Sequence, residues 1–161
     1  MNLAPIIIFA YDRPDHLRRT LDALAKNDLA SQSDLYIYCD GAKETASIEQ
    51  IERIKENRKV AHDADGFKTI TIIEREKNVG LKANIVGAVT EIVNKYGRVI
   101  TLEDDIVTST GFLRYMNDAL EIYADESSVM HISECSPYIL YKCLMIYKKE
   151  IGYLLYKVDI P

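Results

Sequence analysis

The sequence lacks the features that mark several common protein classes. Its three cysteines, Cys39, Cys135 and Cys143, show no CxxC spacing, which argues against a disulfide framework or a zinc site and favours a reducing cytoplasm. The start has no basic region followed by an apolar stretch, so no secretory signal is indicated. No apolar run reaches the length that spans a bilayer.

Basic patches are also lacking. The 161 residues carry a net charge of −5, and no predicted helix has the basic stripe that neutralises nucleic-acid phosphates. We therefore expect no nucleic-acid partner, and we expect any phosphate ligand to arrive with a metal. The sequence has neither a Ser-His-Asp arrangement nor a Gly-x4-Gly-Lys phosphate loop. With 48% apolar and 28% charged residues, the composition is that of a globular domain.

What the sequence has is a regular alternation of strand-like and helix-like segments up to residue 133. Apolar runs predict strands, and spaced apolar residues between them predict helices, one capped by Ser47 and one ended by Gly97. Repeated β-then-α units imply an α/β fold with a mostly parallel sheet. The predicted strands are Ile6–Ala10, Leu35–Cys39, Ile70–Ile73, Val99–Leu102 and Val129–Ser133.

The composition changes after Glu134. Residues 137–158 are rich in Tyr, Leu, Ile and Lys and show no clean period. We therefore divide the chain into a domain at 1–134 and an atypical tail at 135–161. The tail can be a final helix, a segment at a lipid interface, or an abnormal end of the chain.

Polar groups follow each of the first four predicted strands. They are Tyr11-Asp12-Arg13, Asp40-Gly41, Asn78 to Lys82 and Glu103-Asp104-Asp105. Because ligands of open parallel sheets bind beyond the carboxyl ends of the strands, these groups are expected to converge at one edge.

The acidic triplet is the sharpest of these signals. Three adjacent carboxylates repel one another unless a cation relieves them, and Mg²⁺ and Mn²⁺ prefer such hard oxygen ligands. If the strand geometry continues, Glu103 and Asp105 share one face and Asp104 takes the other. The alternative is a solvated turn before the next helix.

The remaining candidates each have a structural alternative. Asp40 can accept from a base N–H or a ribose hydroxyl, or it is a turn residue before glycine. The amides of Asn78 to Lys82 precede a helix and can face an anion, or they form an ordinary loop. Lys82 can pair with phosphate or with the acids, or it is solvated. Arg13 can meet a diphosphate, or it lies beside neighbouring carboxylates.

Taken together, these segments resemble the GT-A glycosyltransferases. The resemblance rests on Ile7 to Pro14, Asp40, the Asn78-Val79-Gly80-Leu81 segment with Asn84, and Leu102 to Ile106 followed by Phe112 to Tyr115. The last of these looks like the Glu-Asp-Asp form of the family's DXD motif. The four motifs occur in the family's order across residues 4–134.

The resemblance implies a Rossmann-like sheet with helices on both faces and a site for a nucleotide-sugar, with a UDP-sugar favoured. Ala10, Tyr11 and Arg13 would line the nucleotide, Asp40 would contact the base, and Asp104 would lie near the ribose and diphosphate. Asp105 would hold Mn²⁺ or Mg²⁺, which acts as a Lewis acid toward the leaving diphosphate. The other residues expected at this donor site are Gly80, Lys82, Asn84 and Glu103.

The resemblance also implies a function and a place of work. We expect a sugar transferase that serves surface polysaccharide synthesis, with a glycan or lipid-linked acceptor, in the cytoplasm or peripherally at the inner membrane face. Members of the family continue beyond this length and build their acceptor site there, so we expect a truncated donor-binding half with no identifiable catalytic base. The alternative is a non-catalytic nucleotide-sugar-binding remnant or partner subunit.

Overall fold

The computed structural model describes residues 3–129, 131–132 and the backbone of 145–148. Five strands form one sheet: β1 (Ile6–Ala10), β2 (Asp34–Cys39), β3 (Thr69–Glu74), β4 (Arg98–Glu103) and β5 (Met145–Lys148). The α-helices are α1 (Pro14–Ala25), α2 (Ile48–His62), α3 (Leu81–Tyr96) and α4 (Phe112–Ile122), and Ala30–Gln32 forms a short 3-10 helix.

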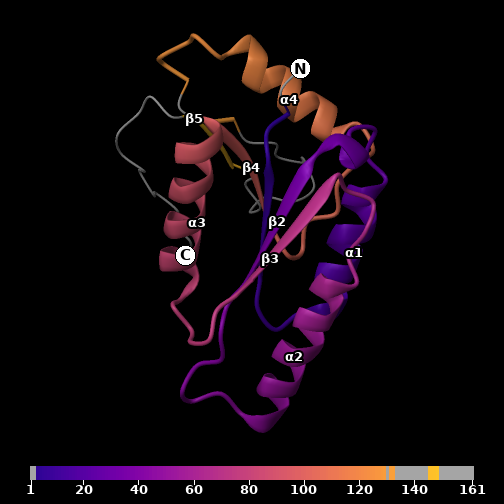
Figure 1. Ribbon diagram of the computed structural model, residues 1–161, viewed down its shortest axis with the longest axis vertical. Helices are drawn as coiled ribbons and strands as arrows, with labels where there is room; N and C mark the ends of the chain where they lie inside the picture. The colour runs from indigo at the N-terminus through magenta and orange to yellow at the C-terminus, as the bar shows by residue number, and fades with distance from the viewer. Residues whose placement is uncertain (1–2, 130, 133–144, 149–161) are drawn as a thin grey trace.

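The strand order is β3-β2-β1-β4-β5, with β1 to β4 parallel to one another (Figure 1). The chain moves outward from β1 to β3 and then returns through α3 to place β4 on the other side of β1. The order therefore reverses between β1 and β4, the position at which open α/β sheets bind their ligands. The four parallel strands confirm the fold class predicted from the sequence.

The fifth strand was predicted in the wrong place. Val129, His131 and Ile132 lie outside any strand, while 130 and 133 fall outside the described residues. Ile132 instead packs against the core as a partly buried side chain, which accounts for the apolar character of this run. A short apolar run alone does not separate a strand from a packed connection.

The edge beside β4 is taken by β5, which comes from the predicted tail and runs antiparallel to β4. A final helix is therefore wrong for 145–148, and the rest of the tail lies outside the described residues. In the part of the chain that the structure describes, no helix is long and apolar enough to cross a bilayer. The division at residue 134 stays a prediction.

Helices cover both faces of the sheet, as expected (Figure 1). On one face, α1, α2 and α4 bury apolar side chains against alternate residues of β1 and β2, such as Ile8 and Ile37. On the other face, α3 contributes Ala88, Val89 and Ile92. Burying each large aliphatic side chain stabilises the fold by roughly 1.5–3 kcal/mol.

The predicted helix boundaries are confirmed by their caps. The amide of Gln50 donates to Oγ of Ser47 at 3.2 Å, and Gly97 ends α3 with a left-handed φ of 81°. The apolar residues of α2 do not all face the core, because Ile48 is 81% exposed whereas Ile54 is buried. The first turn of α2 reaches past the ends of the strands, where no sheet surface lies beneath it (Figure 1).

Two glycines, one inside α3 and one directly after it, give a matched stability test. A Cβ on Gly97 would meet no atom within 4 Å but would force a side chain into a positive φ, so Gly97→Ala should cost about 1 kcal/mol. A Cβ on Gly87, inside the helix, would make only an ordinary contact at 4.0 Å, so Gly87→Ala should stabilise by about 0.5–1 kcal/mol. Urea unfolding measures the change in the free energy of unfolding for each variant. A change in the same direction for both variants would contradict the assigned helix end.

Candidate functional site

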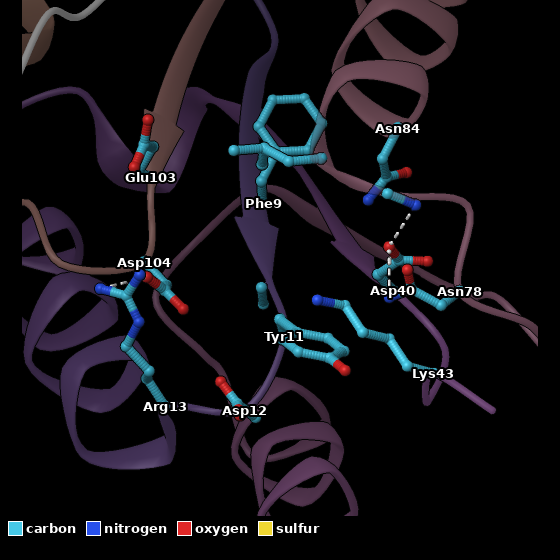
Figure 2. Close-up of a pocket in the computed structure, with 13 residues that line it drawn as sticks. Phe9, Tyr11, Asp12, Arg13, Asp40, Lys43, Asn78, Asn84, Glu103 and Asp104 are labelled. Atoms are coloured by element: carbon cyan, nitrogen blue, oxygen red, sulfur yellow. Dashed lines mark hydrogen bonds and ion pairs between the residues drawn. The ribbon is translucent and has the colours of Figure 1, made fainter. Parts of the chain in front are cut away.

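A pocket of about 240 Å³ opens at the carboxyl ends of the parallel strands (Figure 2). Its walls come from the ends of β1, β2 and β4 and from the start of α3, so segments far apart in sequence converge there as expected. The lining residues are Phe9, Ala10, Tyr11, Asp12, Arg13, Asp40, Lys43, Asn78, Gly80, Leu81, Asn84, Glu103 and Asp104.

The structure brings together most of the residues expected at the donor site. Those that line the pocket are Ala10, Tyr11, Arg13, Asp40, Gly80, Asn84, Glu103 and Asp104. Lys82 does not line the pocket. Leu81 and Asn84 lie on the side of α3 that faces it, and because successive residues of an α-helix point about 100° apart around the axis, Lys82 lies on another side. Asp105 also lies outside the lining.

The acidic triplet bends around Arg13. One guanidinium nitrogen of Arg13 lies 3.0 Å from Oδ2 of Asp105 and 3.8 Å from Oδ1 of Asp104. Strand β4 ends at Glu103 and the chain turns, so the predicted alternation is wrong: Glu103 and Asp104 both line the pocket. Thr20 on α1 fixes the turn by donating from its hydroxyl to the carbonyl of Asp104 at 2.8 Å.

The ionised form of the Asp104 carboxylate is disfavoured by its burial. Its side chain is 8% exposed, and burial raises its pKa to about 6. Arg13 opposes that rise in pKa, while the negative charges of Asp105 and Glu103 add to it. A cation bound beside Asp104 would therefore stabilise the ionised carboxylate.

The donor set fits a divalent metal that is shared with a ligand. Among the described residues no three acidic, histidine or cysteine side chains converge as a metal site. Glu103 and Asp104 nevertheless supply hard oxygen atoms to the same pocket, and Mg²⁺ is often held by one or two carboxylates together with substrate phosphates. Asp105 is engaged by Arg13 and would have to exchange that contact to join such a metal.

Asp40 uses its carboxylate to hold the loop before α3. Oδ1 accepts from the amides of Gly41 and Val79 at 2.8 and 3.0 Å. Oδ2 accepts from the amide of Gly80 and from Nδ2 of Asn78, both at 3.1 Å. The anion that faces the amides of Val79 and Gly80 is thus a carboxylate of the chain itself, which favours the ordinary-loop alternative over an external anion at these two amides.

Gly41 is required by the same junction. A Cβ at this position would lie 2.4 Å from the backbone carbonyl carbon of Lys77. The loops that follow β2 and β3 are therefore in backbone contact, and Asp40 ties them together. The turn interpretation of Asp40-Gly41 is closer to this geometry than a direct contact with a base.

Five lining residues were not among those predicted for the donor site: Phe9, Asp12, Lys43, Asn78 and Leu81. Lys43 lies in an irregular loop after β2, where no periodic pattern marks it. A supporting residue, Arg75, was also missed: its Nε donates to Oδ1 of Asn84 at 2.7 Å. Because a guanidinium only donates, this bond assigns Oδ1 as the acceptor and turns the amide nitrogen of Asn84 the other way. The position of Arg75 directly after β3 was the available signal.

Comparisons with known proteins identify the fold. No protein-family model and no curated protein matches the sequence. Among solved structures, the mannosyltransferase PcManGT from Pyrobaculum calidifontis, in complex with GDP-Man and Mn²⁺, matches 91% of this chain with a TM-score of 0.60 and 13% identity. TarS of S. aureus matches 91% with a TM-score of 0.54 and 14% identity.

A provisionally named nucleotide-diphospho-sugar transferase from Desulfovibrio desulfuricans G20 matches 92% of the chain, with a TM-score of 0.53 and 14% identity. The chain spans 44%, 28% and 64% of the lengths of these three proteins, which is less than two thirds in each case. The chain therefore has the GT-A-like α/β fold of nucleotide-sugar glycosyltransferases, as its motifs predicted.

The four hydrogen bonds of Asp40 lead to a stability prediction. Asp40→Asn replaces one acceptor oxygen by a donor that faces other donors, so it should destabilise the chain by at least about 2 kcal/mol in urea unfolding. It should also accelerate hydrogen exchange at the amides of Val79 and Gly80. Asp28→Asn is the control, since Asp28 pairs with Arg114 at 3.5 Å on the surface and should change stability by less than about 1 kcal/mol. Equal effects would contradict the assigned role.

The raised pKa of Asp104 predicts a pH dependence of stability without added metal. The folded chain holds this proton with a pKa of about 6, against 3.8 for an unperturbed aspartate. More protons are bound in the folded state between these values, so the contribution of Asp104 to stability falls as pH rises from about 4 to about 6. Asp104→Asn should remove that fall in urea titrations, whereas Asp118→Asn, on the exposed side of α4, should retain it. Superimposable profiles for wild type and Asp104→Asn would refute the assignment.

Proposed function

We propose that this chain is the donor-binding part of a metal-dependent glycosyltransferase that uses a nucleotide-sugar. The observation that carries the proposal is the pocket at the β1–β4 switch point, where Glu103 and Asp104 face the space beyond the strand ends. The shared fold supports it, and PcManGT, whose structure holds GDP-Man and Mn²⁺, has that fold.

The charges of the pocket explain why a metal belongs in the proposal. A nucleoside diphosphate is an anion, and Glu103 and Asp104 would repel it. A bound Mn²⁺ or Mg²⁺ would neutralise both the carboxylates and the diphosphate, and as a Lewis acid would favour departure of the nucleoside diphosphate. Asp105 is the further ligand that we propose for this metal.

Arg13 has two roles in this proposal. Without ligand it balances the acidic turn through Asp105 at 3.0 Å. Its side chain is 51% exposed and also lines the pocket, so its guanidinium can reach a phosphate oxygen when the metal takes over the acids. The chain's own residues would thus bind and orient the donor. Among the residues that line the described pocket, none is identified as a catalytic base.

The wider setting is proposed from the resemblance. A glycan or lipid-linked acceptor, and a place in surface polysaccharide synthesis in the cytoplasm or at the inner membrane face, are the expected context. UDP-sugars are the favoured donors, and GDP-sugars belong in any test.

Thermal unfolding with nucleotide-sugars tests the proposal. A donor at about 100 times its Kd stabilises the folded state by about 2.7 kcal/mol, so a panel of UDP- and GDP-sugars with Mn²⁺ should contain one that raises Tm by several degrees. Asp105→Asn should abolish this shift, because it weakens the metal that joins chain and diphosphate. Asp118→Asn, an equal change of charge away from the pocket, should keep it.

The outcomes separate the parts of the proposal. If no nucleotide-sugar raises Tm with Mn²⁺ or Mg²⁺, the proposed function is wrong. If the shift is equally large in EDTA, donor binding stands and metal dependence is wrong. An enzyme transfers the sugar to water or to a supplied acceptor and releases the nucleoside diphosphate, whereas a binding protein does not. Measuring the released nucleoside diphosphate distinguishes the two.

A further inference from the structure

Lys43 is a pocket residue whose charge has no counterpart in the described part of the chain. It lies in the loop after β2 and its side chain extends into the pocket toward Tyr11 (Figure 2). Among the described residues, the ammonium of Lys43 makes no ion pair or hydrogen bond, and only its backbone carbonyl accepts, from the amide of Ala46 at 3.0 Å. An ammonium group in such a position is available to a ligand.

The other charges of the pocket are largely engaged. Asp12 accepts from Nε2 of Gln50 at 2.9 Å and lies 3.6 Å from a guanidinium nitrogen of Arg53. Asp40 is occupied by four donors of its own loops. Arg13 is held by the acidic turn. Lys43 is therefore the cation that the pocket can offer without breaking an existing contact.

The pocket has an acidic end and a basic end, and Lys43 lies at the basic end. Glu103 and Asp104 follow β4, whereas Lys43 follows β2, and β1 lies between these strands. Figure 2 shows the acidic residues and Lys43 on opposite sides of Tyr11 and Phe9. A ligand whose metal-bound diphosphate lies at the acidic end would extend its nucleoside toward Lys43.

We propose that Lys43 is a specificity-determining residue that donates a hydrogen bond to a carbonyl oxygen of the nucleobase. This inference rests on the proposed function. Uracil carries such an oxygen at position 4 and guanine carries one at position 6, whereas cytosine and adenine carry an amino group there. An ammonium donates and cannot accept, so it stabilises the first pair and opposes the second. The substrate class is thus the uridine and guanosine diphosphate sugars.

The saturated carboxylate of Asp40 strengthens the argument. An aspartate with unoccupied oxygen atoms at this end would favour bases that donate. Because the oxygens of Asp40 accept from Gly41, Asn78, Val79 and Gly80, the charged group left to read the base at this end is the ammonium of Lys43, which is a donor. The pocket therefore selects for an acceptor on the base.

Calorimetric titration of the full chain with UDP, CDP, GDP and ADP, each with Mn²⁺, tests this assignment. Wild type should bind UDP at least about tenfold more tightly than CDP, and GDP at least about tenfold more tightly than ADP. Lys43→Ala should bring both ratios close to one by weakening UDP and GDP, with little change for CDP and ADP. Lys26→Ala is the matched control, because Lys26 is exposed at the end of α1 away from the pocket and should leave both ratios unchanged.

Other results would overturn the assignment in distinguishable ways. A uniform loss of affinity for all four nucleotides in Lys43→Ala would mean that Lys43 binds the diphosphate. Unchanged affinities for all four nucleotides would mean that it contacts no part of the nucleotide. If wild type binds none of the four nucleotides, the proposed function itself fails; if it binds them and only the ratios disagree, the proposed function stands and the role of Lys43 is wrong.

Discussion

The contact between Arg13 and the acidic turn is the interaction on which the site depends. It joins the end of β1 to the end of β4 at 3.0 Å, across the point where the strand order reverses. Without a cation, the three successive carboxylates would repel one another beside a buried sheet. Arg13 keeps them in place, and Thr20 anchors the same turn to α1, so the pocket is shaped before any ligand arrives.

The other half of the pocket is held by a different kind of contact. There, the carboxylate of Asp40 accepts hydrogen bonds from amides of adjacent loops, and Arg75 orients Asn84 by donating to its side-chain oxygen. These bonds lie within the framework and leave few groups free to meet a ligand. The two halves of the pocket therefore differ: the half after β4 presents charged side chains to the pocket, and the half after β2 and β3 is held in shape by hydrogen bonds within the chain.

Much of the fold could be predicted because buried parallel strands leave continuous apolar runs such as Ile6–Ala10, and because caps such as Ser47 and Gly97 mark helix ends. The strand-end rule then located most of the pocket residues. What escaped prediction depends on tertiary partners. Strand β5 exists by pairing with β4, and Lys82 turns away from the pocket through the rotation of α3. No local pattern encodes the four bonds of Asp40.

The backbone contact of Gly41 with Lys77 has a consequence for how such a site can change over time. The framework of the pocket is locked by glycine, amides and a saturated carboxylate, where most substitutions would damage folding. A lysine in the adjoining irregular loop is free of those duties. If Lys43 reads the ligand as we propose, selection can exchange that side chain while the scaffold stays the same, and single substitutions in this loop could change which ligand the pocket binds.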